Sequence, residues 1–141
     1  MSHPMSVRFR RDDVVRGVKH EAEVQRRSTS ALIEELVDEG LRSRRHPLIA
    51  FRNGATGRRA VLVGGADVWE VIGGVVGGDV AADQRVDRAV DVFGWPRTHV
   101  EAAVAYYAEF TDEIDAEIEV NRSAAADAEQ AWRRGRDLLA R

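Results

Sequence analysis

Cysteine is absent from this 141-residue sequence, which excludes a disulfide framework and thiolate zinc sites. No apolar run approaches the roughly 18 residues that a membrane span requires, and the first residues do not resemble a signal peptide. Lysine occurs once, as Lys19, so nearly all of the 21 basic residues are arginines. Hydrophobic residues still make up 44% of the chain, enough for a packed core. These features predict a soluble, cytoplasmic protein with no membrane partner.

The common catalytic and ligand-binding motifs are also missing. The glycine pairs at 64–65, 73–74 and 77–78 form neither a G-x-x-x-x-G-K-[ST] loop nor a G-x-G-x-x-G turn. The four histidines have no spacing suited to a pair of metal ligands. The acidic run at 112–119 follows a single predicted helix, which is more typical of a solvated face than of a metal site. We therefore expect no enzyme activity, no metal and no cofactor.

The N-terminal end carries the chain's surplus of positive charge. Residues 1–45 contain 10 basic and 8 acidic side chains, whereas the remainder contains 11 and 16. Within this region Ser6-Val7-Arg8-Phe9-Arg10 alternates between polar and apolar residues. Such alternation predicts a strand with Val7 and Phe9 on a buried face and Ser6, Arg8 and Arg10 on an open face. Arginine forks suit phosphates and guanine edges, so this open face is a candidate DNA-binding surface.

Two helices are predicted after this strand. The acids at 12–13 mark the start of the first helix, where negative charge complements the helix dipole. Ser28, Thr29 and Ser30 precede an apolar stripe between Leu32 and Leu41, and hydroxyl residues in that position are candidate N-caps. Residues 42–47 end in a proline and are predicted to form a linker.

The rest of the chain predicts a short hairpin followed by helices, so the fold class is mainly α with short β. The hairpin strands are expected at 48–52 and 58–63, around a glycine-containing turn. Asp67 could cap a short helix that ends at the glycine pairs 73–74 and 77–78, and another helix is expected at 83–93. Apolar residues between 100 and 118 repeat at helical spacing, and Ser123 is expected to restart a last helix.

Residues 5–44 resemble a ribbon-helix-helix domain, the family of the Arc, MetJ and CopG repressors. The resemblance rests on the order strand, helix, short turn with Arg27-Ser28, and helix. It implies that two chains pair their strands, and that Ser6, Arg8 and Arg10 enter the DNA major groove. It also implies that Ser28, Thr29 and Ser30 place the second helix against a DNA phosphate. The expected partners are double-stranded operator DNA and a second copy, in a homodimer or a higher even oligomer.

Residues 46–120 are similar to an antitoxin-associated family, the domain of unknown function 433. The similarity is carried by Gly57-Arg58-Arg59, by Asp67-Val68-Trp69 and by an alanine-rich segment ending in Tyr106-Tyr107. Together the two resemblances imply a VapB-like antitoxin that represses its own operon and neutralises a PIN-type ribonuclease toxin. The expected domains are a ribbon-helix-helix at 1–45, a small helix-turn-helix-like module at 46–121 and a C-terminal helix at 122–141.

The C-terminal helix is the predicted toxin-binding segment, through Trp132, Arg133, Arg134 and Arg136. Arginine forks could occupy the carboxylates of a PIN active site, and Trp and Arg are frequent interface hot spots. Alternatively, Trp132 packs on the chain's own core or dimer and the arginines are solvated. Two further functions remain open: a dimeric protein-interaction module, and a stand-alone transcriptional regulator without a toxin.

Overall fold

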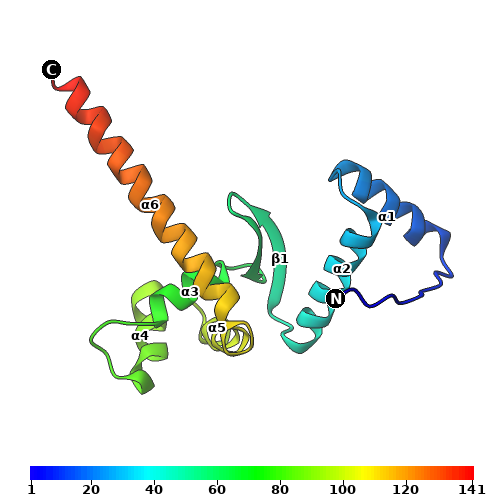
Figure 1. The fold of residues 1–141 in the computed structure, drawn as a ribbon. Coiled ribbons are helices and arrows are strands. Elements are labelled where there is room, and N and C mark those ends of the chain that lie inside the picture. Colours follow the sequence, from blue (N-terminus) through cyan, green and yellow to red (C-terminus); the bar gives the residue numbers. More distant parts are fainter. The chain divides into compact units, whose positions relative to one another are not determined.

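The computed structural model describes residues 1–141, which divide into two units, Met1–Arg42 and Ser43–Arg141. Unit 1 contains α1 (Asp12–Val24) and most of α2 (Thr29–Arg45). Unit 2 contains the hairpin strands β1 (Ile49–Gly54) and β2 (Gly57–Leu62), followed by helices (Figure 1). These helices are α3 (Val68–Val75), η1 (Ala82–Gln84), α4 (Arg85–Phe93), α5 (Arg97–Glu109) and α6 (Thr111–Leu139). The predicted fold class, mainly helical with a short antiparallel hairpin, is confirmed.

Residues 1–11 form neither helix nor strand in the single chain, so the strand predicted around Ser6–Arg10 is absent from it. A β-strand needs a hydrogen-bonded neighbour, and the chain's only sheet pairs β1 with β2. In a ribbon that neighbour would belong to a second chain, so the strand around Ser6–Arg10 stays a prediction.

The hairpin of unit 2 forms where the sequence predicts it. Its antiparallel register pairs Ile49 with Leu62, Phe51 with Ala60 and Gly54 with Gly57. Gly57 closes the turn at φ +110°, a conformation that residues with a Cβ rarely adopt. The hairpin places Ile49, Ala60 and Leu62 on the buried side.

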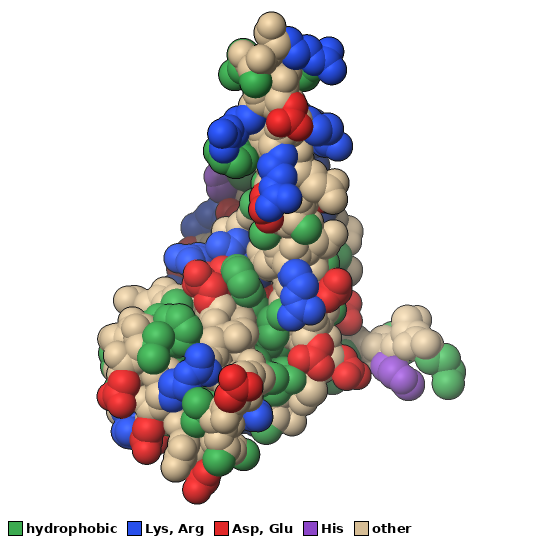
Figure 2. Space-filling view, turned by 90° about the vertical axis from the view of Figure 1, so that its left-hand side faces the viewer, with side chains coloured by type: hydrophobic (Ala, Val, Ile, Leu, Met, Phe, Trp, Pro, Cys, Tyr) green, Lys and Arg blue, Asp and Glu red, His purple; other side chains and the backbone are tan.

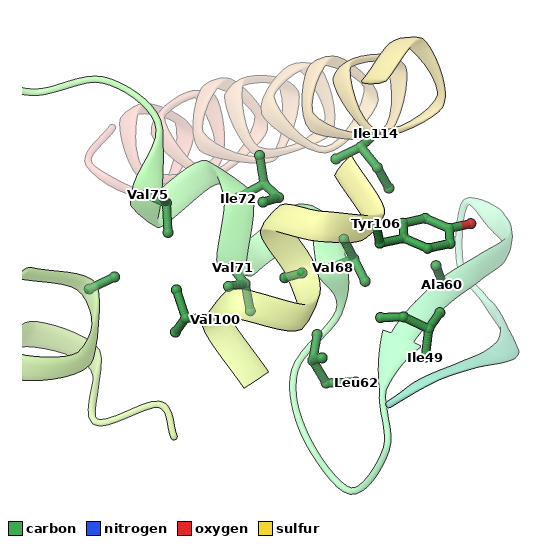
Figure 3. Close-up of a cluster of buried hydrophobic side chains, with 12 residues drawn as sticks. Ile49, Ala60, Leu62, Val68, Val71, Ile72, Val75, Val100, Tyr106 and Ile114 are labelled. Atoms are coloured by element: carbon green, nitrogen blue, oxygen red, sulfur yellow. The ribbon is translucent and has the colours of Figure 1, made fainter. Parts of the chain in front are cut away.

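The core of unit 2 is built around α3. Val68, Val71, Ile72 and Val75 of this helix are all buried. Their neighbours from the hairpin, α5 and α6 converge on them, as Figure 3 shows. The buried set beyond α3 comprises Ile49, Ala60, Leu62, Ala89, Val100, Ala103, Tyr106 and Ile114.

Two predicted helix boundaries are wrong, whereas α3 ends at Val75, between the glycine pairs 73–74 and 77–78 predicted to end it. α2 continues through Arg45 instead of giving way to a linker at 42, and it stops just before His46-Pro47, where a proline disfavours helix for the preceding residue. No new helix starts at Ser123: the tail breaks earlier, at Phe110, and α6 then runs without interruption to Leu139.

Candidate nucleic-acid interface and partner surface

The turn between α1 and α2 is held by a compact set of hydrogen bonds. Arg26 has φ +52°, the left-handed conformation that closes a helix C-terminus. The N–H groups of Arg26 and Arg27 donate back to the carbonyls of Glu23 and Ala22, at 3.1 and 3.0 Å. Ser28 Oγ then accepts from the N–H of Ala31 at 3.1 Å, which makes Ser28 the N-cap of α2.

A basic hollow lies beside this turn, within unit 1. Its volume is about 400 Å³. Three cationic side chains line it, together with the first residues of α2. The lining residues, hereafter the turn hollow, are Lys19, Ala22, Glu23, Arg26, Arg27, Ser28 and Thr29. The N–H groups in the first turn of a helix lack intrahelical partners, so the start of α2 and the cations together favour an anion.

Arg27 has a structural role in addition to its place in the hollow. Its guanidinium donates to Glu35 Oε2 at 2.9 Å and to the carbonyl of Ala31 at 3.1 Å. This half-buried pair fixes the first turns of α2 to the turn that precedes them. Of the three cations of the turn hollow, Arg26 and Lys19 are therefore better placed than Arg27 to bind an anion.

The N-terminal segment is exposed on both of its predicted faces. Ser6, Arg8 and Arg10 are exposed, as the open-face assignment requires. The opposite face is exposed as well, with Val7 at 63% and Phe9 at 42%. The single chain therefore offers no surface that covers these two apolar side chains.

Unit 1 as a whole covers few of its apolar side chains. Within it, Ala22 and Leu32 are the buried hydrophobic residues. Larger apolar residues of the N-terminal segment and of both helices remain exposed. Those on the helices have the spacing of an amphipathic helix. This exposed set, hereafter the unit 1 apolar face, is Val7, Phe9, Val14, Val24, Leu36, Val37 and Leu41.

The outer part of α6 carries the predicted toxin-binding residues. Residues 122–134 and 136–141 are all exposed, so this half of the helix packs on nothing within unit 2. Trp132 is 60% exposed, and the guanidinium of Arg136 lies 4.8 Å from the centre of its ring. Arg133 pairs with Glu129 one turn earlier. Figure 2 shows this part of α6 as a column with basic, acidic and hydrophobic side chains on its surface.

A buried charge cluster that the sequence did not reveal lies where α3 begins. Asp67 is 4% exposed and accepts hydrogen bonds from Arg52 at 2.7 Å, from Trp69 Nε1 at 3.0 Å and from Arg59. Glu117 of α6 belongs to the same cluster. Burial, reinforced by the neighbouring carboxylates of Glu113 and Asp67, raises the pKa of Glu117 to about 7. These residues come from β1, β2, α3 and α6, so no local motif could have linked them.

The acidic run at the start of α6 is partly occupied by tyrosines of α5. Tyr106 donates its hydroxyl hydrogen to Glu113 at 2.9 Å, and Tyr107 donates to Asp115 at 2.7 Å. The hydrogen bond to Asp115 raises the pKa of the Tyr107 hydroxyl. These bonds fix the base of α6 to α5, and they assign the two acids a structural role.

No helix combines the length and the apolar character required of a membrane-spanning segment. Comparison with protein-family models, with curated proteins and with solved structures gave no match.

Proposed function

We propose that this chain is a dimeric, sequence-specific DNA-binding protein of the type II antitoxin class. The unit 1 apolar face is the observation that carries the proposal. Seven apolar side chains stay exposed in a unit that buries only two, and such a face is normally covered by a partner. A second copy fits, because the N-terminal segment, which pairs with nothing in the single chain, can form a two-stranded ribbon with its own counterpart.

The basic side chains of unit 1 then have a role in DNA recognition. In a ribbon, Val7 and Phe9 would face the helices, and Ser6, Arg8 and Arg10 would face outward. An antiparallel pair of strands fits the major groove, where each arginine can bind guanine O6 and N7 in a bidentate manner. The turn hollow, with Ser28, Thr29 and Ser30 at the start of α2, would hold a backbone phosphate and position the ribbon.

Binding to the DNA upstream of the chain's own gene tests this half of the proposal. Fluorescence anisotropy would compare the full-length protein with its Arg8→Ala/Arg10→Ala variant over a salt series. We expect the variant to bind about a hundredfold more weakly or worse, because a dimer loses four groove arginines. The Arg122→Ala/Arg141→Ala variant removes the same charge from α6 and should bind like the wild type. Equal binding by all three proteins would reject the ribbon as the DNA reader.

The outer part of α6 supports the antitoxin assignment. Trp132 and its neighbours Arg133, Arg134 and Arg136 form an exposed set of the residue types that dominate protein interfaces. Their guanidinium groups suit a metal-dependent ribonuclease whose active site is a cluster of carboxylates. If a neighbouring gene encodes a metal-dependent ribonuclease, its inhibition by this chain, and the loss of inhibition with Arg133→Ala/Arg134→Ala, would support this partner. Undiminished inhibition by the variant would show that Arg133 and Arg134 do not bind the ribonuclease.

A protein-interaction module without DNA binding is the rival function. It is favoured by the exposed half of α6, which needs a partner whether or not unit 1 reads DNA. The two functions differ in the salt series above, because an interaction module would show neither sequence preference nor dependence on Arg8 and Arg10.

A further inference from the structure

The exposed half of α6 continues a heptad repeat that begins in the core. Ile114 is fully buried and Ile118 packs against the core, four residues further on. Beyond Ile118, residues on the same side of α6 follow at alternating steps of three and four residues up to the end of the helix. We call this stripe the α6 seam; its residues are Asn121, Ala125, Ala128, Trp132, Gly135 and Leu139. A stripe with this period faces one side of a helix and suits a second helix alongside it.

Large and small residues alternate along the end of the seam. Trp132 and Leu139 are large and exposed, at 60% and 91%. Gly135 lies between these two residues, and Ala128 lies one step before Trp132. A Cβ added at Gly135 would meet nothing within 4 Å. A partner helix running parallel in register would set Trp132 against its own copy and leave two glycines facing each other. An antiparallel partner can instead bring each large residue to a small one, the arrangement that fills space best.

We propose that residues 128–139 of α6 pair antiparallel with the same segment of a second copy of the chain. Trp132 packs on the partner's Gly135, and Leu139 packs on the partner's Ala128. In the same register the flanking Leu138 meets the partner's Ala131. Each of these contacts occurs twice because the pair is two-fold symmetric. The pairing does not rest on the function proposed for unit 1.

The charges beside the seam select this register. Glu129 lies next to the partner's Arg136, and the symmetric contact repeats the pair. Sliding one helix by a heptad would set Glu129 against the partner's Glu129, and Arg136 against the partner's Arg122. Sliding it by two heptads would restore attraction but would place Leu139 opposite the partner's Ile114, which is buried in its own core. Two criteria therefore select the same register: opposite charges meet beside the seam, and each large side chain on the seam meets a small one.

The overlap is short, and this sets the strength of the contact. Twelve paired residues span about 18 Å of helix. That length forms a small interface, so we expect a weak and reversible association. Trp132 is central to the overlap and also belongs to the surface proposed to bind the toxin. Pairing and toxin binding would therefore exclude each other.

Disulfide cross-linking tests the direction of the helices, since the chain has no cysteine of its own. Full-length Ala128→Cys and Leu139→Cys variants, one of them enlarged by a mass tag, would be co-expressed and mildly oxidised. The proposal requires that the two variants link to each other and that neither links to itself when expressed alone. Self-linked products from the single variants would show a parallel pair, and no linkage in the mixture would show no pair. Either result overturns the proposal.

Sedimentation of the full-length chain tests the packing and the charges, in a Leu36→Asp background that removes the contact proposed for unit 1. Gly135→Leu fills the space that receives Trp132, and we expect at least about tenfold weaker pairing. Gln130→Leu adds the same side chain on the opposite face and should leave pairing unchanged. Glu129→Arg should weaken pairing, and Glu129→Arg/Arg136→Glu should restore it, although the pair between residues 129 and 133 within the chain stays broken. Weakening by Gln130→Leu, or no rescue by the double variant, would contradict the register.

Discussion

At the scale of single residues, Glu117 has the most unusual environment in the chain. Its Oε2 is buried without a hydrogen-bond partner, and its pKa is raised to about 7 from the ordinary value of 4.5. Below pH 4.5 the carboxyl is protonated in both folded and unfolded chains and costs nothing. Between pH 4.5 and 7 the unfolded chain releases the proton more readily, so the folded state loses stability as the pH rises.

Glu117→Gln should therefore stabilise unit 2 at pH 8 and have little effect at pH 4. Glu117 as a whole is only partly buried, and solvent screens the interaction, so we expect a gain of about 1–2 kcal/mol. Urea unfolding followed by circular dichroism at both pH values measures it. Glu119→Gln, an exposed neighbour on α6, is the matched control and should change stability equally little at both. A Glu117→Gln gain that is the same at pH 4 and pH 8 would show that ionisation is not its cause.

At the scale of elements, the start of α3 depends on one side chain. Asp67 is the N-cap residue; its N–H donates to Glu70 Oε2 at 3.3 Å, and its carboxylate joins both hairpin strands through Arg52 and Arg59. Asp67→Ala would remove the cap and leave Arg59 without this partner in a site where its side chain is 19% exposed.

We expect Asp67→Ala to destabilise unit 2 by about 3 kcal/mol, since breaking a buried ion pair leaves a charge uncompensated. Thermal unfolding of the full-length protein would measure the loss. Asp79→Ala removes an exposed acid from a loop and should change stability by less than about 0.5 kcal/mol. Equal melting of the two variants would mean that the cluster at Asp67 does not stabilise α3.

Local signals predicted the elements better than their ends. The acids at 12–13, the capping residues Ser28 and Asp67, and the hairpin glycines all act within a few residues, and the structure confirms the elements that they start or connect. The ends of helices depended on packing that sequence patterns do not contain. Gly74 belongs to one of the two glycine pairs predicted to end α3, yet it lies inside the last turn, where a Cβ would lie 2.8 Å from the Phe93 ring, which indicates a close approach.

The candidate functional residues also divide into those that local sequence signals could predict and those that depend on the fold. The N-cap role of Ser28 could be read from neighbouring residues, whereas the sequence left open whether Trp132 packs on the chain's own core, and in the structure it is 60% exposed. The cluster of Arg52, Arg59, Asp67 and Glu117 could not be predicted, because the fold brings it together from segments up to 65 residues apart in the chain.

At the scale of the whole molecule, the two units differ in how much apolar surface they bury. Unit 2 surrounds α3 with a continuous core, whereas unit 1 leaves the unit 1 apolar face open. If a second copy covers that face, the stability of unit 1 must depend on protein concentration, because dimerisation and folding are then linked. Unit 2 carries its own core, so its stability should depend on concentration only through the weak α6 contact.

Leu36→Asp tests this linkage in full-length protein. Leu36 is 46% exposed in the single chain, so an aspartate there should cost the single chain little. In a dimer the same change would bury an unpaired carboxylate, and we expect at least about a hundredfold weaker dimerisation. A Trp132→Ala background removes the proposed α6 contact, so sedimentation velocity would report unit 1 alone. Glu34→Ala, on the exposed polar side of α2, should sediment like its parent. If Leu36→Asp also sediments like its parent, the open face is not where two chains meet, and Arg8 and Arg10 lose the paired ribbon that would bring them to DNA.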